Sequence, residues 1–209
     1  MNTIKKITES VSAFQDLFST EKNRTINSKL IQNLLIKAKY INFGIVNFEK
    51  IDKSENLRLY LAYSEANLYG VLIPESTDFI ENNAISEAAF YVSSFGNSSH
   101  KIDPNLKPKE EHPNQISYHE LSERISLWEN NYSTWTDNNL KDGFLVNYFE
   151  IDSANFSSKT NNTCVFGLIE SKNANFSLID TFSNEYSIDL VVINDAYMDT
   201  VRPVPPYKP

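Results

Sequence analysis

A short stretch of this chain occurs twice, and the repeat limits what the chain can fold into. Residues 45–52 have the sequence IVNFEKID and residues 145–152 have LVNYFEID, at an offset of 100. A second match relates residues 66–68 to residues 174–176, at an offset of 108. The two matches occur in the same order, and each set follows a segment with helical apolar spacing. We therefore predict an internal duplication that gives two similar units of helix and sheet.

Each unit begins with a predicted helix whose apolar residues lie at positions i, i+4, i+7 and i+11. That spacing places them on one face of an α-helix. The first set is Ile7, Val11, Phe14 and Phe18, and the second set is Leu121, Ile125, Trp128 and Tyr132. Thr8 or Ser10 is the expected N-cap of the first helix. Ser117 and Glu120 have the S-x-x-E spacing of a capping box at the start of the second.

A further helix is predicted in the first unit, over residues 28–40. Its apolar residues would form a buried face made of Leu30, Ile31, Leu34, Leu35 and Ala38. Lys29, Lys37 and Lys39 would lie on its wet face. The last two lysines would be close to the negative pole of the helix dipole, which favours cations.

The apolar pattern then changes to a period of two. In residues 57–63, LRLYLAY, every second residue is apolar, as expected of a half-buried strand. Residues 68–73 supply the returning strand of a hairpin, which Pro74 ends because proline cannot donate to a strand ladder. Further strands are predicted at 42–51, 85–95, 144–151, 164–170, 175–181 and 187–194. The fold class is therefore α+β, with two duplicated helix-on-antiparallel-sheet units that can pack about a pseudo-twofold axis.

Prolines and polar residues suggest where the chain divides. Residues 97–115 contain three of the eight prolines among polar residues, a composition typical of a linker or a long exposed loop. We predict a first unit at 1–96 with two helices and a second unit at 116–200. The segment 201–209, VRPVPPYKP, has too many prolines for a helix or a central strand, which predicts an extended tail.

The chain is acidic, and its charge is unevenly distributed. The formal net charge of −8 repels nucleic-acid phosphates and anionic lipids, so we expect neither a nucleic-acid nor a membrane partner. Residues 1–60 contain ten Lys and Arg against six Asp and Glu, whereas residues 61–209 contain nine against 21. Two interpretations stay open, namely two solvated surfaces or a head-to-tail attraction within the chain or between copies.

Targeting signals are not evident in the sequence. No run approaches the roughly 18 apolar residues that a membrane-spanning helix needs. Residues 7–14, ITESVSAF, follow two lysines where a signal peptide would have a continuous apolar stretch. The only cysteine, Cys164, excludes an intramolecular disulfide. A cytoplasmic location is the expectation.

Several features of the second unit occur together in a known group of proteins. They are a helix that opens with Ile116-Ser117 and contains Trp128, a strand at 165–169, and Asp199-Thr200 followed by Pro203 and Pro205-Pro206. This combination resembles a family of small, uncharacterised α+β proteins common in Bacteroidota. Family members often have cysteines near the terminal proline pair, and this chain has none there. The resemblance implies an α+β architecture and a bacterial origin, and it brings no activity.

The common nucleotide-binding and hydrolase motifs do not occur in the sequence. The five glycines are scattered, so neither a dinucleotide-binding fingerprint nor a phosphate loop can form, and there is no G-x-S-x-G elbow. Cys164 lies in a predicted strand, which favours a buried cysteine over a nucleophile. We expect no cofactor.

Two sets of polar residues have a potential chemical role. The first set could hold zinc and consists of His100, His112 and His119 with Glu110 or Glu111. Its spacing matches no metal-site template, so we predict solvated histidines and no metal. The second set could form a carboxylate pair or a calcium site and consists of Asp189, Asp195 and Asp199. For these carboxylates a solvated sheet edge is favoured.

Aromatic and proline residues are the candidates for a binding site. Trp128 lies on the apolar stripe and is assigned to the core. Trp135 is predicted to be in an exposed loop, where an indole suits recognition of a partner, and Tyr132 is close to it in the sequence. The second candidate is the tail, which could dock on an aromatic groove through Pro203, Pro205, Pro206 and Tyr207.

These observations favour a non-catalytic binding or assembly module, whose partner is another protein or a second copy of the chain. One alternative is an acidic inhibitor or immunity-type protein that neutralises a basic effector by charge complementarity. Another is an enzyme with an unrecognised hydrolytic site in a groove between the two units. That alternative requires a buried Asp, Glu or His with a shifted pKa.

Overall fold

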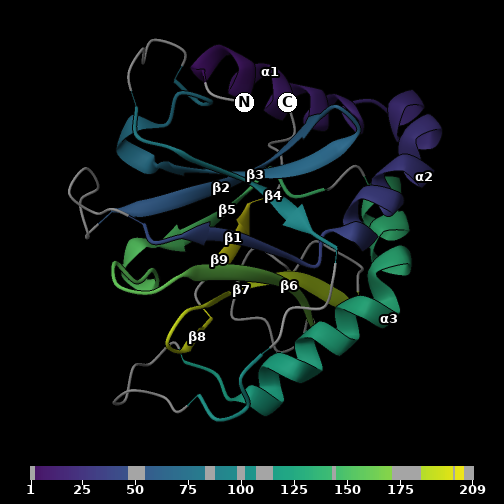
Figure 1. Ribbon diagram of the computed structural model, residues 1–209. Coiled ribbons are helices and arrows are strands. Elements are labelled where there is room, and N and C mark those ends of the chain that lie inside the picture. The colour runs from purple at the N-terminus through teal and green to yellow at the C-terminus, as the bar shows by residue number, and fades with distance from the viewer. Residues whose placement is uncertain are drawn as a thin grey trace.

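The computed structural model describes residues 3–46, 55–82, 88–97, 102–106, 115–142, 145–170, 185–199 and 201–204. Within these residues the chain forms three α-helices and one sheet of nine antiparallel strands, which confirms the α+β class. The helices are α1 (Ile4–Asp16), α2 (Glu21–Lys37) and α3 (Tyr118–Asp142). Figure 1 shows a strongly curled sheet with α1 across its top and with α2 and α3 side by side along one flank.

The helices follow the predicted apolar stripes, but two of them begin elsewhere than expected. The Oγ1 of Thr3 caps α1 by accepting a hydrogen bond from the N–H of Lys6, so the expectation of Thr8 or Ser10 as the cap was wrong. The hydroxyls of both residues instead donate to backbone carbonyls one turn earlier in the helix. Thr20 caps α2, which begins at Glu21, seven residues before the expected start. A threonine at this position satisfies a free N–H of the first turn and sets the boundary.

The nine strands form one continuous series of antiparallel pairs. Their order in the sheet is β8-β7-β6-β1-β4-β3-β2-β5-β9. Their bounds are β1 (Tyr40–Gly44), β2 (Asn56–Ser64), β3 (Asn67–Pro74), β4 (Tyr91–Gly96), β5 (Tyr148–Asp152), β6 (Asn162–Glu170), β7 (Tyr186–Ile193), β8 (Tyr197–Met198) and β9 (Val201–Val204). The predicted hairpin at 57–73 is confirmed as β2 and β3, and the last part of the strand predicted at 85–95 belongs to β4. The strand predicted at 175–181 lies outside the described residues.

The curl of the sheet follows from its two edge strands. β8 and β9 lie at opposite ends of the strand order, yet only two residues separate them in the chain. The sheet must therefore bend until its two edges approach each other. The bend encloses an inner core to which alternate residues of β2 and β6 contribute, namely Leu57, Leu59, Leu61, Cys164, Phe166 and Leu168. The helices α2 and α3 complete this core with Ile31, Leu34, Leu35, Trp128 and Trp135.

The outer face of the sheet is covered in two places. Under α1, Tyr60 and Val71 pack against Ile7 and Val11. Beside the first turns of α3, the outward residues of β6 and β7 pack with Leu121 and with residues before the helix; this cluster contains Ile116, Leu121, Val165, Val191, Ile193 and Tyr197. β2 and β6 thus bury both of their faces, one against the inner core and one against a helix or loop.

The predicted units at 1–96 and 116–200 share the sheet rather than having separate sheets. β1 pairs with β6, and β2 pairs with β5, so the four strands of the first half lie together in the sheet between strands of the second half. Val46 and Val146, which are equivalent in the repeat, are both buried in the inner core. Part of the first repeat, at 47–52, lies outside the described residues. The duplication therefore stays a prediction.

The segments expected to be a linker and a tail are partly tied to the sheet. Ile102 and Leu106 pack against the cluster beside α3, and the hydroxyl of Tyr197 donates to the carbonyl of Asp103. Residues 201–204 of the expected tail form the edge strand β9, in which Pro203 is aligned with Phe149 of β5. A proline is tolerated there because an edge strand has one side free of ladder hydrogen bonds.

Candidate functional site

The aromatic residues proposed for binding do not form an exposed site. Trp135 is only 5% exposed and lies within α3, so its assignment to an exposed loop was wrong. The helix continues to Asp142 because Trp135 follows Trp128 by seven residues and lies on the same buried face. The two indoles are in contact, with ring centroids 5.7 Å apart. Tyr132 is half-buried against the same core and contacts Trp128.

The other proposed binding residues belong to the end of the chain. Pro203 lies in β9 and is half-buried. Pro205, Pro206 and Tyr207 lie outside the described residues, so docking of the tail on a partner stays a prediction.

The most concentrated charged cluster surrounds Arg124 of α3. Its guanidinium donates to the carboxylate of Asp189 at 2.7 Å, to that of Asp199 at 2.7 Å and to that of Glu120 at 2.6 Å. Asp189 comes from β7, and Asp199 follows β8 directly. The cluster therefore ties α3 to the sheet at the point where the chain passes from one edge strand to the other. Arg124 was not among the predicted site residues, although its position between Leu121 and Trp128 on the apolar stripe was a signal of burial.

A glycine in β6 makes room for this cluster. Gly167 is directly aligned with Asp189 in the ladder between β6 and β7. A Cβ on Gly167 would lie 3.0 Å from the Cβ of Arg124, so the glycine lets α3 approach the sheet closely. The arginine then lies over the strand pair, within reach of the buried carboxylate.

Asp189 is 3% exposed, which corrects the expectation that it lies on a solvated edge. Burial and the neighbouring charge of Asp199 raise the pKa of Asp189 to about 6, against the opposing effect of Arg124. Such a group is what the hydrolytic alternative requires. However, one oxygen of Asp189 accepts from Arg124 and the other accepts from the N–H of Leu190. The carboxylate is thus engaged within the fold, and the enzymatic alternative stays a prediction.

A second charged cluster lies elsewhere on the outer face of the sheet, around Arg58 of β2. Its guanidinium donates to Asp78 at 2.8 Å and to Glu75 at 3.0 Å, and it lies 4.9 Å from the ring centroid of Tyr148. The hydroxyl of Tyr60 also donates to Asp78, at 2.6 Å. This cluster holds the turn after β3 against the strand, and all of its members belong to the fold rather than to an open site.

The remaining chemical candidates have ordinary surroundings. Cys164 is fully buried in β6, and burial raises the pKa of its thiol well above the usual range, which confirms the prediction of a buried cysteine. His119 is exposed on α3, as expected, whereas His100 and His112 lie outside the described residues. Among the residues that the structure describes, no three His, Cys, Asp or Glu side chains converge as a metal site would require.

The most distinctive exposed feature is the outward face of α2, which we call the α2 strip. It consists of Lys22, Ile26, Lys29, Asn33, Ile36 and Lys37. These positions fall within about a third of the helix circumference, at 100° per residue. Ile26 is 66% exposed and Ile36 is 38% exposed, and the strip contains no acidic residue. Lys29 and Lys37 are exposed, as predicted for the wet face, whereas Lys39, which was predicted with them, lies after the end of α2 and is half-buried. The residues before 28 were missed because the helix was expected to start later.

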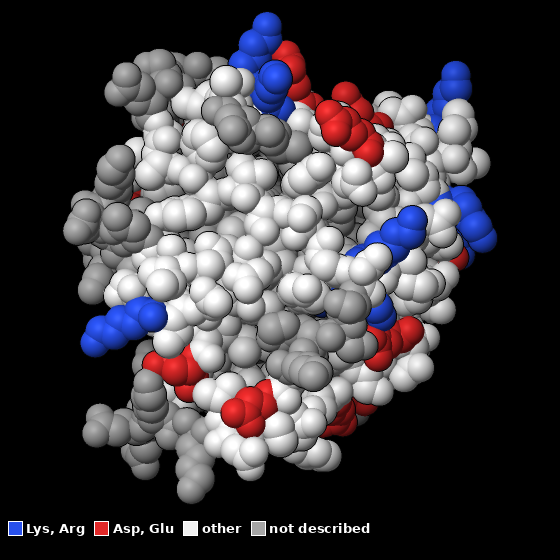
Figure 2. Space-filling view, viewed as in Figure 1, with Lys and Arg blue, Asp and Glu red and all other residues white. Residues whose placement is uncertain are grey.

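Beside the α2 strip, α3 presents acidic residues. Glu123 and Glu129 are exposed, and Asp137 is half-buried between the helices. The two helices are joined by hydrogen bonds from Gln32 to Asp137, at 2.6 Å, and by the ion pair of Lys39 with Glu129, at 2.9 Å. Figure 2 shows Lys and Arg side chains on the upper part of this flank and Asp and Glu side chains on its lower part. The flank therefore carries adjacent basic and acidic areas.

Comparison of the chain with protein-family models, curated proteins and solved structures gives no match. The resemblance of the second unit to a Bacteroidota family thus stays a prediction. Across the described part of the chain, none of the helices has both the length and the apolar character needed to cross a membrane. The candidate functional site is accordingly the flank formed by α2 and α3.

Proposed function

We propose that this protein is a non-catalytic interaction module that binds a protein partner through the α2 strip. The observation that carries the proposal is the exposure of Ile26 and Ile36 among three lysines on one helix face. An isolated exposed isoleucine is common on protein surfaces. Two on one strip, with cations around them, combine apolar area with charge, which is the composition of a binding face.

The charged groups inside the fold also support a non-catalytic role. Asp189 and Asp78 are both 3% exposed, and the ion pairs with Arg124 and Arg58 occupy them. Acid–base catalysis requires a group that can reach the reacting atoms. In the described residues, the buried carboxylates instead connect elements of the sheet to α3 and to the turn after β3.

The test is capture from a lysate of the source cell, followed by a titration of the captured protein. Wild type is compared with the double variant Ile26→Asp, Ile36→Asp. We expect the variant to lose at least tenfold in affinity for the captured protein, measured by isothermal titration calorimetry. The matched control is Ile45→Asp, because Ile45 is also an exposed isoleucine, at 55%, and lies after β1, away from α2. Equal affinity of all three proteins for every captured protein contradicts the proposal.

A second candidate function is that of an acidic inhibitor of a basic effector, and the acidic residues of α3 favour it. Glu123 and Glu129 face outward beside the half-buried Asp137. In that case the captured protein is basic, and its binding weakens at high salt because charges at an exposed interface are screened. The variant Glu123→Lys then reduces the affinity for the captured protein more than Ile26→Asp does. Binding that depends on Ile26 and not on Glu123 contradicts this second function.

A further inference from the structure

The three lysines of the α2 strip have no partner of opposite charge. Lys22, Lys29 and Lys37 are exposed, and none of them forms an ion pair within the part of the chain that the structure describes. Residues 3–46, which contain α1, α2 and β1, have seven Lys and Arg against three Asp and Glu, although the whole chain has a net charge of −8. The strip is therefore a basic area on an acidic molecule.

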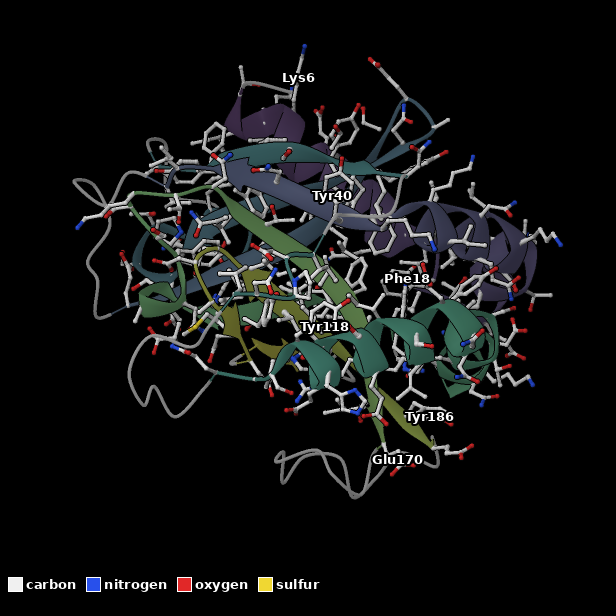
Figure 3. All side chains as sticks on the ribbon, turned by 60° about the horizontal axis from the view of Figure 1, so that its bottom comes forward. Lys6, Phe18, Tyr40, Tyr118, Glu170 and Tyr186 are labelled. Atoms are coloured by element: carbon white, nitrogen blue, oxygen red, sulfur yellow. The ribbon has the colours of Figure 1, made fainter. Side chains whose placement is uncertain are left out.

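The acidic residues of α3 are already bonded or lie too far along the helix to balance this charge. Asp137 accepts a hydrogen bond from Gln32 of α2, at 2.6 Å. Glu129, earlier in α3, pairs with Lys39, just after α2, at 2.9 Å, so the two helices run in opposite directions. Glu123 comes six residues before Glu129, about 9 Å further along α3, and thus lies beyond the end of α2. Figure 3 shows the two helices side by side, with side chains extending outward from both.

Basic and apolar side chains alternate along the α2 strip. In chain order they are Lys22, Ile26, Lys29, Ile36 and Lys37. The two isoleucines are ten residues apart, which is about 15 Å along an α-helix, and the lysines extend over about 22 Å. Another helix advances by the same 1.5 Å per residue and packs about 8–10 Å away, so its side chains stay in step with the strip over several turns.

We infer that the segment of the partner that binds the α2 strip is an acidic amphipathic helix. Its apolar side chains contact Ile26 and Ile36, and its Asp or Glu side chains pair with the three lysines of the strip. The inference rests on the proposed function and adds the chemistry of the partner. It follows from charge complementarity, because the described part of the chain supplies no carboxylate to these lysines.

The surroundings of the α2 strip favour an acidic helix over other polyanions. At 0.15 M salt, charges more than about 8 Å away are largely screened, so a segment on the strip interacts mainly with the lysines and not with the net charge of −8. Nucleic-acid backbones are bound by cations and hydrogen-bond donors, which leaves the exposed isoleucines unused. An anionic bilayer is a broad surface and would also meet the exposed Glu123 and Glu129 of α3.

The experiment is a titration of the isotope-labelled full chain with synthetic helical peptides of about 18 residues, which is long enough to span the strip. The acidic peptide has leucines on one face and glutamates beside them. Three related peptides replace every glutamate by glutamine, every glutamate by lysine, or every leucine by serine. We expect the acidic peptide to shift backbone amide NMR signals of α2 and to bind about tenfold more tightly than each of the others. We also expect its binding to weaken as salt is raised.

Two triple variants separate the charge of the strip from the charge of the whole molecule. Each replaces three exposed lysines by glutamine, so both change the net charge by the same amount. The test variant is Lys22→Gln, Lys29→Gln, Lys37→Gln. The control variant, which leaves α2 unchanged, is Lys5→Gln, Lys6→Gln, Lys159→Gln. We expect the test variant to bind the acidic peptide about tenfold more weakly than wild type, and the control variant to bind it equally well. Matching thermal unfolding midpoints show first that both variants are folded.

Several results would overturn the inference. One is a neutral or basic peptide that binds as tightly as the acidic peptide. Another is an acidic peptide that shifts no signal of α2 at roughly 1 mM, the weakest affinity expected of a specific contact. A third is an equal loss of binding in the test and control variants. Vesicles of phosphatidylserine and phosphatidylcholine are the last probe, and binding to them without binding to the acidic peptide assigns the strip to a membrane surface instead.

The proposed function is judged by a separate measurement. If a captured protein loses affinity on Ile26→Asp, Ile36→Asp while the acidic peptide does not bind, the α2 strip binds a protein of different chemistry. The proposed function then holds and the inference fails. If the acidic peptide binds α2 and the double variant keeps its affinity for every captured protein, the strip has the inferred chemistry but the proposed function fails.

Discussion

The two buried arginines, Arg124 and Arg58, use the same chemistry at very different distances along the chain. Arg124 reaches Asp189, 65 residues away, and also Asp199, so it joins α3 to β7 and to the segment after β8. Arg58 reaches Asp78, only 20 residues away, across a hairpin and the turn that follows it. The first arginine therefore connects parts of the molecule that only the tertiary fold brings together. The second stabilises a local segment.

The carboxylates of the two clusters also differ in which hydrogen-bond donors they keep if the arginine is lost. Asp78 would keep the hydroxyl of Tyr60 and the backbone N–H of Ile80. Asp189 would keep only the N–H of Leu190 among the hydrogen bonds that the structure shows for it. A buried carboxylate without a counter-charge is costly. The comparison thus predicts that the fold depends more on Arg124 than on Arg58.

The largest expected effect on stability comes from the loss of Arg124. We expect Arg124→Met to lower the free energy of unfolding by about 3–5 kcal/mol, because it leaves Asp189 buried and unpaired. Arg58→Met is the matched control and should cost about 1–3 kcal/mol, since Asp78 keeps the donors of Tyr60, Ile80 and Glu81. Urea unfolding at pH 7 measures both. Equal losses for the two variants would remove the distinction between the clusters.

The pH dependence of stability tests the pair of Arg124 and Asp189 without removing the arginine. The expected change in stability is therefore smaller. The pKa of Asp189 in the folded protein, about 6, lies above its ordinary value of 3.8, because of burial and the charge of Asp199. The folded state then binds more protons than the unfolded state between these two values. The contribution of Asp189 to stability is therefore full below pH 4 and is lost as the pH rises to about 6. Between pH 4 and 7, the difference in thermal unfolding midpoint between wild type and Asp189→Asn should show this decline. A difference that does not change with pH would contradict the prediction.

The contribution of Tyr60 to the local cluster is expected to be smaller still. Tyr60→Phe removes a buried donor from Asp78 while keeping the ring, so we expect a loss of about 1–2 kcal/mol in the free energy of unfolding. Tyr63→Phe, in the same strand but half-exposed, serves as the control and should change little. If Tyr60→Phe leaves stability unchanged, Arg58 and the backbone donors of the turn suffice for Asp78, and the local cluster is more redundant than proposed.

The smallest effect is expected at Gly167. Its replacement by alanine would place a methyl group 3.0 Å from the Cβ of Arg124, so α3 must shift by a few tenths of an ångström. We expect Gly167→Ala to cost about 1 kcal/mol. The cost should be the same in the Arg124→Met background, because methionine keeps the Cβ that alanine would contact. A cost that vanishes in this background would show that Gly167 accommodates the guanidinium rather than the helix.

Local sequence patterns predicted which helices and strands form better than they predicted the residues at which these elements begin and end. The stripe from Ile7 to Phe14 and the alternation in β2 identified a helix and a strand, because each pattern states which face is buried. The starts of α1 and α2 were less certain, since several Ser and Thr residues offered equivalent caps. Trp135 was placed in a loop because polar residues surround it in the sequence. Its burial against Trp128 depends on the curled sheet and has no local signal beyond the seven-residue spacing.

The candidate site was predicted only in part. The wet face of the second helix, with Lys29 and Lys37, was expected from periodicity alone. The neighbouring acidic row on α3 was not, because the sequence does not state which helices lie side by side. Asp189 was expected to be solvated for the same reason, since nothing near it in the sequence indicates that Arg124 comes to it from a distant helix.

The sequence by itself determined which segments are helices and strands, because apolar periodicity and backbone propensity act within a few residues. It also determined that the chain is acidic and has a basic first part. Only the tertiary structure decided that the strands of the first half lie between strands of the second half in one sheet and that β8 and β9 bring its edges together. It also decided that α2 and α3 share a flank with opposite charges. Those features depend on contacts between residues far apart in the chain, whose formation is governed by how the whole apolar surface is buried at once.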